Sequence, residues 1–345
     1  MQLADFDYDL PAERIAQTPV EPRDAARLLV DRGDPAVAPP HDAHVRDLPG
    51  LVAPGDVVVV NDTRVMPARL RLARRSGGAV EVLLLEPRDA RRLRWEALVR
   101  PGGRIREGEE LVGPDGATVA VMGPRTAAGD TFEVELVPDA AGGTDALLER
   151  RGEMPLPPYI TAAPGRRERY QTVYARDGHS AAAPTAGLHF TPGLMAALEA
   201  RGATIARVEL TVGLDTFQPV TAEDPRTHAM HAESYRVPAA TLAACRECRA
   251  RGGRVLAVGT TAVRALESAA RGDAEGRTRL FIHRGFEFAV VDRLLTNFHL
   301  PRTTLLMMID AVVGPRWRAL YAHAIDRGYR MLSFGDAMLL DRHLR

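Results

Sequence analysis

A change in the sequence pattern within the first half of the chain constrains the fold most. Between about Ala68 and Val137, short strand-like runs alternate with turns rich in Gly, Pro and Asp. The runs cover residues 79–85, 94–100, 110–112, 117–122 and 131–136. Regularly spaced short strands without a helical period predict a small all-β barrel or sandwich.

Alternating strands and helices flank this region on both sides. A β-branched run at 57–60 predicts a buried strand, and residues 28–30 predict another. After a Pro-rich connector at 154–160, strands are expected at 204–212, 254–258, 280–282 and 330–333, and helices at 192–201, 238–251, 262–271, 303–312 and 317–327. We therefore predict an α/β main domain (1–67 and 153–345) with an inserted all-β barrel domain (68–152), a division that suits 345 residues.

Charge and composition exclude several classes of protein. The 45 basic and 45 acidic residues cancel, so there is no global basic footprint for nucleic acid, although local arginine clusters remain. The acidic N-terminus lacks the features of a signal peptide, and no apolar run reaches membrane-spanning length. A cytoplasmic protein that does not enter a membrane is expected. Cys245 and Cys248 cannot complete a four-ligand zinc site alone.

The segment His179 to Phe190, H-S-A-A-A-P-T-A-G-L-H-F, precedes a helix with clear start signals. Thr191 can cap that helix, and Pro192 suits its first position. Small residues let backbone approach a flat ligand, and the helix N-terminus offers free N–H groups. The alternative is a tight core turn in which His189 is hydrogen-bonded inside the protein.

Polar groups follow several of the expected strands. Asn61 and Asp62 end one strand, and Gly259-Thr260-Thr261 leads from another into a helix. Similar exits occur at 211–220, 296–301 and 329–338. In α/β proteins the binding site is formed by residues at the ends of such strands. A plain turn or an ordinary helix cap would have the same sequence pattern. No dinucleotide-binding glycine pattern and no phosphate-binding loop is present, which disfavours a nicotinamide dehydrogenase or a nucleoside triphosphatase.

The run T-H-A-M-H-A-E at 227–233 places His228, His231 and Glu233 close together. A metal site would need a further ligand or an open position, and no second cluster of this type is evident. We favour the interpretation that His231 or Glu233 acts as a general acid or base. The alternative is that these are exposed loop residues without a catalytic role.

Several longer blocks point to one family. In order they are N-D-T-R-V-M-P-A-R-L (61–70), M-P-L-P-P-Y-I (154–160), Y-Q-T-V-Y (170–174), A-A-P-T-A-G-L-H-F (182–190), M-H-A-E (230–233), V-G-T-T (258–261), T-N-F-H-L-P (296–301) and G-D-A-M (335–338). Over nearly its whole length the chain resembles the S-adenosylmethionine:tRNA ribosyltransferase-isomerase family.

The resemblance implies a reaction. The ribosyl part of S-adenosylmethionine, a co-substrate, moves onto 7-aminomethyl-7-deazaguanine at the wobble position of tRNA with GUN anticodons. It rearranges to give epoxyqueuosine, and adenine and methionine are released. No metal is implied, and the fold is an α/β domain with an inserted β-barrel. We expect a monomer or a weak homo-oligomer.

Site residues follow from the resemblance and from the chemistry of a sulfonium donor, which needs proton transfer at its 5′ carbon and at the acceptor amine. Candidates for proton transfer are His189, His231, Glu233 and Asp336. Thr260 and Thr261 are expected to hold the donor's carboxylate or a phosphate. The other expected substrate contacts are Asn61, Asp62, Arg64, Pro184, Thr185, Gly187, Thr216, Phe217, Gly259, Arg264, Asn297 and His299.

Some loops depart from the family pattern. Its G-[ST]-V-A-A-P is H-S-A-A-A-P here (179–184), its H-V-G-x-G-T-F is T-V-G-L-D-T-F (211–217), and its Y-P-G is H-R-G (283–285). Its E-S-T-L and S-A-F are R-T-T-L (302–305) and D-A-V (310–312). These departures leave two alternatives open: ribosyl transfer to a small molecule, such as a free deazapurine or a secondary-metabolite amine, or a non-catalytic RNA- or nucleotide-binding protein.

Overall fold

The computed structural model describes residues 1–33, 39–102, 105–127, 129–138, 142–162, 167–176, 180–212, 220, 222–228 and 230–342. The chain forms two compact units. One comprises Met1–Thr63, Pro157–Gly178 and Ala183–Arg345, and the other comprises Arg64–Leu156 and His179–Ala182. The predicted fold class, an α/β domain with an inserted β-barrel, is confirmed.

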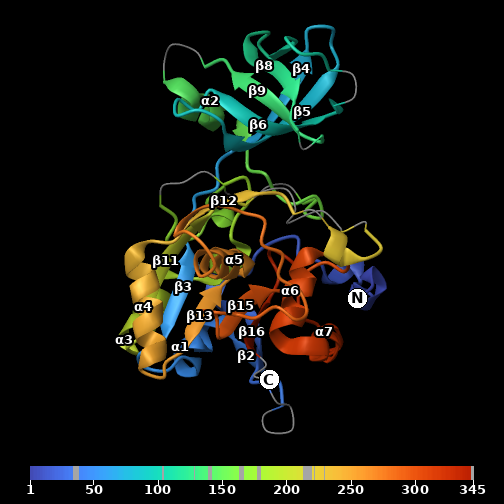
Figure 1. Ribbon diagram of the computed structural model, residues 1–345. Helices are drawn as coiled ribbons and strands as arrows, with labels where there is room; N and C mark the ends of the chain where they lie inside the picture. Colours follow the sequence, from blue (N-terminus) through green and yellow to red (C-terminus); the bar gives the residue numbers. More distant parts are fainter. Residues whose placement is uncertain are drawn as a thin grey trace. The chain divides into compact units, whose positions relative to one another are not determined.

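The smaller unit is a closed antiparallel barrel (Figure 1). Its strands follow the order β4-β5-β6-β9-β8-β7, and pairing of β7 with β4 closes the ring. In β6, R-W-E-A-L-V-R alternates buried and more exposed residues, which is the period of a strand with one face in a core. The elements are β4 (Arg69–Arg74), β5 (Ala79–Pro87), β6 (Arg94–Arg100), β7 (Glu110–Val112), β8 (Thr118–Arg125), β9 (Phe132–Leu136), α2 (Gly143–Arg151) and β10 (Gly152–Glu153).

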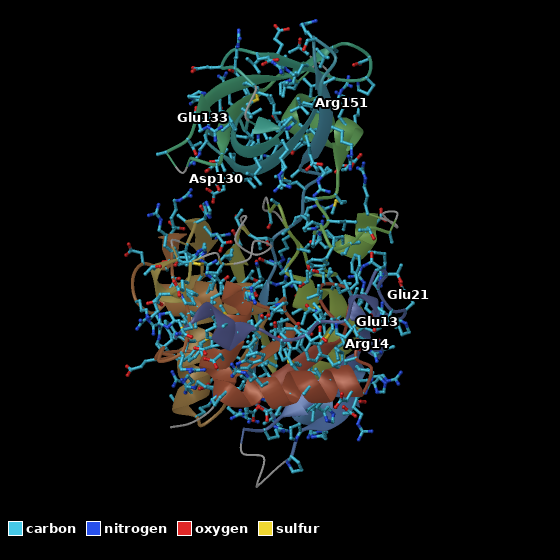
Figure 2. The ribbon with its side chains drawn as sticks, turned by 90° about the vertical axis from the view of Figure 1, so that its right-hand side faces the viewer. Glu13, Arg14, Glu21, Asp130, Glu133 and Arg151 are labelled. Atoms are coloured by element: carbon cyan, nitrogen blue, oxygen red, sulfur yellow. The ribbon has the colours of Figure 1, made fainter. Side chains whose placement is uncertain are left out.

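Arginines of the barrel lie beside carboxylates. The cluster near the start of the barrel is paired as Arg69–Glu81, Arg71–Glu153 and Arg74–Glu109, with N–O distances of 3.8, 2.9 and 2.5 Å. Arg151 pairs with Asp115, and acidic Asp130 and Glu133 lie on the same unit (Figure 2). The barrel therefore carries charges of both signs.

The larger unit is built on a sheet of nine described strands, in the order β14-β12-β11-β3-β13-β15-β16-β1-β2. Neighbours among β11, β3, β13 and β15 are parallel, whereas β16 runs antiparallel to β15. The sequence V-V-V-V-N of β3 is buried throughout, as expected for a central parallel strand. The strands are β1 (Arg27–Asp31), β2 (His41–His44), β3 (Val57–Asn61), β11 (Thr204–Leu210), β12 (Glu233–Arg236), β13 (Val255–Val258), β14 (Glu275–Thr278), β15 (Arg293–Asn297) and β16 (Ala337–Asp341).

Helices cover the sheet (Figure 1). On one face, Leu194 and Leu198 of α3 belong to the same hydrophobic core as Val58 and Val60 of β3. The α-helices are α1 (Leu48–Leu51), α3 (Pro192–Ala200), α4 (Ala239–Ala250), α5 (Thr260–Ala269), α6 (Thr304–Val313) and α7 (Trp317–Asp326). Short 3₁₀ turns are η1 (Leu3–Phe6), η2 (Ala12–Arg14), η3 (Arg23–Ala25), η4 (Val45–Asp47), η6 (Arg167–Tyr170), η7 (Thr185–His189), η9 (Pro225–Thr227) and η10 (Gly314–Arg316). Among the helices that the structure describes, none is long and apolar enough to cross a membrane.

Two predicted strands are wrong. Residues 280–282 belong to no strand, and β14 ends before them at Thr278. Residues 330–333 belong to a loop, because Leu332 adopts a left-handed conformation (φ 68°) and the chain then turns at Gly335. A side chain on Gly335 would overlap the Arg330 carbonyl oxygen. The strand begins only at the buried run that starts with Ala337.

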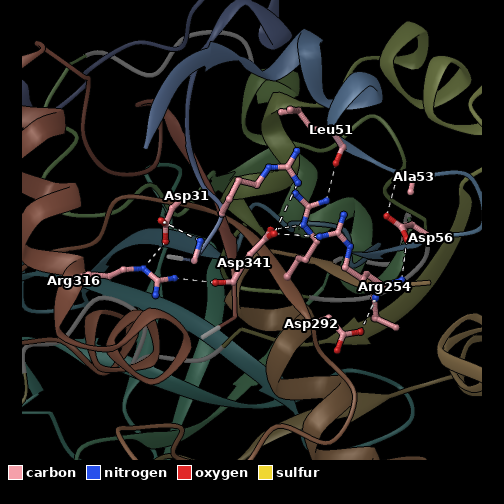
Figure 3. Close-up of polar contacts among 12 residues, drawn as sticks. Asp31, Leu51, Ala53, Asp56, Arg254, Asp292, Arg316 and Asp341 are labelled. Atoms are coloured by element: carbon pink, nitrogen blue, oxygen red, sulfur yellow. Dashed lines mark hydrogen bonds and ion pairs between the residues drawn. The ribbon is translucent and has the colours of Figure 1, made fainter. Parts of the chain in front are cut away.

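Ion pairs hold the edge of the sheet where β13 and β15 begin and β16 ends (Figure 3). The Arg293 guanidinium is buried, and its Nε lies 2.6 Å from the Asp341 carboxylate. Arg254 contacts the same carboxylate, and the Arg254 backbone N–H donates to Asp56. Burial lowers the pKa of Arg293, which makes its carboxylate partner important. This edge is therefore structural, and the opposite edge is left to carry the site.

Candidate active site

A pocket opens at the carboxyl ends of β13 and β15, beside the loop that precedes β16. Its empty space is about 610 Å³, including the mouth open to solvent. This is the edge at which open α/β sheets bind ligands. The lining residues are Tyr159, Ala183, Pro184, Thr185, Ala186, Val212, Gly259, Thr260, Thr261, Thr296, Asn297, Phe298, His299, Leu300, Thr303, Leu305, Leu332 and Ser333.

The described lining mixes polar and apolar residues and carries no formal charge. It presents hydroxyl groups, one amide and one imidazole, and none of these described residues is Asp, Glu, Lys or Arg. Tyr159 and Ser333 share a hydrogen bond of 2.7 Å between their hydroxyl oxygens. Burial raises the pKa of Tyr159 to about 12, so this hydroxyl is neutral at physiological pH. These residues must therefore recognise a ligand mainly through hydrogen bonds and helix dipoles.

Two helix N-termini meet at the pocket. Helix α5 starts at Thr260 after Gly259, whose φ of 87° suits glycine, and Thr303 caps α6 through Leu306 N–H. The first turn of each helix has backbone N–H groups without helical partners and a partial positive charge. The Thr261 hydroxyl is buried, lines the pocket and has no hydrogen-bond partner among the described residues. Together these groups form a binding site for a carboxylate or a phosphate.

Asn297 joins two walls of the pocket. Its Oδ1 accepts a hydrogen bond from the Thr185 hydroxyl (3.0 Å), which belongs to η7. Its Nδ2 lies 3.2 Å from His189 Nε2 and 3.2 Å from the Leu332 carbonyl oxygen. One amide at the end of β15 therefore fixes η7 relative to the strained loop at Leu332.

A family model described as "Queuosine biosynthesis protein" matches residues 3–340. The chain belongs to this family. The resemblance read from the sequence is confirmed. The S-adenosylmethionine:tRNA ribosyltransferase-isomerases of Symbiobacterium thermophilum and Moorella thermoacetica are 51% and 50% identical to it. Each alignment covers 99% of this chain and 100% of the relative.

A solved structure from the family agrees with the fold. The crystal structure of the S-adenosylmethionine tRNA ribosyltransferase from Thermotoga maritima has a TM-score of 0.54 and 38% sequence identity. The match covers 97% of this chain and 99% of that one.

Seven of the residues expected to contact substrate line the described pocket. They are Pro184, Thr185, Gly259, Thr260, Thr261, Asn297 and His299. The expected contacts Thr216 and Phe217 lie outside the described residues. Tyr159, Thr296, Thr303, Leu332 and Ser333 were not predicted. Tyr159 and Thr296 nevertheless stand inside the blocks 154–160 and 296–301 that signalled the family, and Ser333 stands in the strand exit 329–338.

The four residues expected to transfer protons do not line the pocket that the described residues form. Asp336 is buried, and its two carboxylate oxygens accept the backbone N–H groups of Arg27 (2.9 Å) and Arg330 (2.8 Å). Burial raises the pKa of Asp336. Glu233 forms a buried ion pair with Arg264. His231 is partly buried just before β12. Their catalytic roles stay predictions.

Arg264 lines a second, smaller cavity that shares Leu305 with the pocket. The rest of its lining is mainly apolar, with Met230, Leu280, Phe281, Ile282, Thr304 and Met308. A mainly apolar cavity beside a polar one suits a ligand with an apolar part. The structure thus places Arg264 next to the pocket and in the ion pair that holds β12 to α5.

The remaining expected contacts lie elsewhere. Asn61 bonds both backbone groups of Leu210 and so ties β3 to β11, and Asp62 lies 3.5 Å from Arg207. Burial raises the pKa of Asp62. Arg64 is exposed on the barrel unit. Gly187 lies against Tyr174. Substrate binding by these residues stays a prediction.

The ring of His228 packs edge-on against Phe281, with 6.2 Å between centroids, while Glu233 is turned toward Arg264. Within the described part of the chain, no group of three or more His, Cys, Asp or Glu residues could hold a metal ion.

Two buried histidines make the protein sensitive to acid. Burial lowers the pKa of His189 to about 4 and that of His299 to about 3, from 6.5. Below pH 6.5 the histidines of the unfolded chain take up protons, whereas the buried histidines of the folded chain stay neutral. Their contribution to stability is therefore complete above pH 6.5 and is lost toward pH 4. The urea concentration at the midpoint of unfolding should therefore decrease as the pH is lowered from 7.5 to 5.5. His189→Asn should reduce this dependence, and a midpoint of the native chain that stays constant over this range would contradict the prediction.

Proposed function

We propose that this chain transfers and isomerises the ribosyl moiety of S-adenosylmethionine onto 7-aminomethyl-7-deazaguanine at the tRNA wobble position. The product is epoxyqueuosine, and adenine and methionine leave. The proposal is carried by the pocket that two helix N-termini share, within a chain that matches the family over residues 3–340. The relatives' names support S-adenosylmethionine as co-substrate and tRNA as acceptor. The GUN anticodon is part of the proposal.

The donor's carboxylate is assigned to the first turns of α5 and α6. A carboxylate there would accept hydrogen bonds from backbone N–H groups and from the Thr261 hydroxyl, which has no other partner among the described residues. Among the described lining residues there is no fixed anion to hold the sulfonium, so in this proposal the described part of the site binds through the carboxylate end and through packing. We assign His189 and Asp336 to holding the walls in place, since their polar atoms already contact other groups of the protein.

The test uses the full-length chain, S-adenosylmethionine and tRNA that carries the aminomethyl-deazaguanine. Adenine and methionine should appear in equal amounts, and mass spectrometry of the tRNA should show the added ribosyl-derived group. A parallel reaction with the free deazapurine should give no product. Product from the free base and none from tRNA would replace the proposed acceptor, and a chain that releases no adenine in either reaction would contradict the activity.

Thr261 gives a test of donor binding. Thr261→Val should weaken the affinity for S-adenosylmethionine about tenfold, because a charge-assisted hydrogen bond contributes on the order of 1.5 kcal/mol. Stability should not fall, since the hydroxyl has no partner among the described residues. Calorimetric titration measures the affinity, and Thr204→Val at the exposed start of β11 is the control. Equal donor affinity in Thr261→Val and the native chain would remove Thr261 from the carboxylate site.

A further inference from the structure

His299 is placed differently from every other histidine that the structure describes. It follows β15 directly and lines the pocket. Among the described lining residues, only His299 and Tyr159 can titrate. Tyr159 is a neutral hydroxyl already bonded to Ser333. The imidazole of His299 is therefore the one titratable side chain of the described lining that can offer a nitrogen lone pair to a ligand.

The position of this imidazole is fixed on three sides. The His299 backbone N–H donates to the Tyr321 hydroxyl (3.0 Å), and its carbonyl oxygen accepts from the Tyr8 hydroxyl (2.7 Å). Its Nε2 lies 2.9 Å from the buried Thr296 hydroxyl. No described residue bonds its Nδ1. Nδ1 is thus the ring nitrogen available to a ligand in the pocket.

Three of the other candidates for a base lack such an atom, and the fourth, His231, does not line the described pocket. His189 Nε2 is bonded by Asn297, and a hydrogen bond to the backbone of Arg23 engages its ring as well. Both carboxylate oxygens of Asp336 accept hydrogen bonds from backbone N–H groups, and Glu233 is paired with Arg264. These side chains also stand outside the described pocket lining. Geometry therefore separates His299 from the residues that the sequence favours.

We propose that His299 is the base that removes a proton from C5′ of the S-adenosylmethionine donor, an inference that rests on the proposed function. The C5′–H bond breaks, the proton passes to Nδ1, and the electron pair stays on C5′, where the adjacent sulfonium stabilises it. In this proposal Nε2–H donates to the Thr296 hydroxyl, 2.9 Å away, so that the lone pair lies on Nδ1. Thr296 is then a positioning residue.

A buried imidazole is neutral and can act as a base, but burial also weakens it, so the charge left on C5′ must be stabilised by its surroundings. Burial lowers the pKa of His299 to about 3, so the ring is neutral at pH 7. A neutral imidazole can accept a proton, whereas donation would leave an imidazolate. The nearby N-termini of α5 and α6 supply positive potential that stabilises the electron pair left on carbon.

The experiment compares the native full-length chain with His299→Gln and His299→Asn. His323→Gln, on α7 and partly exposed beside Asp42, is the control. Three quantities are measured: affinity for S-adenosylmethionine, deuterium uptake at C5′ of the donor recovered from D₂O, and the single-turnover rate of adenine release with modified tRNA. A circular-dichroism melt of each variant selects the one of the pair that folds.

The expected result is a fall of at least about 100-fold in both exchange and adenine release for the His299 variant, with donor affinity within about threefold of the native value. Thr296→Val should lower the rate about tenfold without changing KM. A His299 variant that releases adenine at the native rate would overturn the inference. A His299 variant that loses turnover but keeps deuterium exchange at C5′ would also overturn the inference. His299 would then act on the proton of the acceptor amine and not on that of C5′. A native chain that releases no adenine would instead be a failure of the proposed function.

Discussion

Replacing Glu233 with Gln should lower the free energy of unfolding by about 3–5 kcal/mol, because breaking a buried ion pair leaves one charge without its counter-ion. The side chains of Glu233 and Arg264 are 3% and 8% exposed, so water cannot take over the lost contact. The matched control is Glu209→Gln, which breaks the exposed Glu209–Arg236 pair between β11 and β12. That change should cost less than about 1 kcal/mol. Urea denaturation followed by circular dichroism measures both.

The double variant Glu233→Leu/Arg264→Met separates charge from packing. Removing both charges should recover much of the stability lost in Glu233→Gln, since apolar residues of similar size often replace a buried ion pair without loss. If Glu233 acts only as a proton-transfer residue, Glu233→Gln would instead keep native stability and lose turnover. That outcome would contradict the structural role argued from the ion pair.

Two departures from the family pattern turn out to contact each other. Arg284, in the H-R-G turn, donates two hydrogen bonds of 2.9 and 2.8 Å to the Asp310 carboxylate of α6. Asp310 is fully buried, and the bond to it is the main cause that raises the pKa of Arg284. The two replacements form one bidentate pair that fastens the loop before β15 to α6. They therefore have a structural explanation and do not argue for a different acceptor.

Sequence patterns predicted elements whose signals are local. The alternation in 94–100 gave β6 its bounds, and Thr191 and Pro192 marked the start of α3. Residues 330–333 were mistaken for a strand because a left-handed Leu332 has no signature in the sequence. The short, polar β12 was not predicted either, since it lies near the edge of the sheet and owes its place to pairing with β11 and β14.

The candidate site shows the same limit. Polar residues at strand exits predicted Thr260, Thr261, Asn297 and His299, because the ends of parallel strands meet at one edge. Sequence could not tell which histidine faces the ligand. His189 sits in the 3₁₀ turn η7 and is directed to Asn297, whereas His299 lines the pocket. That difference depends on tertiary contacts such as the bond from Asn297, which joins residues 108 positions apart.

Gly187→Ala should be strongly destabilising, because an added Cβ would overlap the Tyr174 hydroxyl oxygen and come within 3.0 Å of Thr172 Cγ2. Both residues are buried, so the side chains cannot swing into solvent. Overpacking of this kind costs about 1–3 kcal/mol, and more where the backbone must move. Movement of η7 would also disturb the bond from Thr185 to Asn297, so turnover should fall with stability.

Tyr174→Phe provides the rescue. The Tyr174 hydroxyl has no hydrogen-bond partner among the described residues, so its removal alone should change stability little. In the double variant Gly187→Ala/Tyr174→Phe the oxygen that Cβ would strike is gone, and part of the lost stability should return. Gly193→Ala in α3 is the control, since its Cβ would meet only Thr191 Oγ1 at 3.9 Å and alanine favours a helix. Thermal melts compare the four chains. A Gly187→Ala chain as stable as the native one would show that η7 can shift, and would return Gly187 to its predicted role beside a ligand.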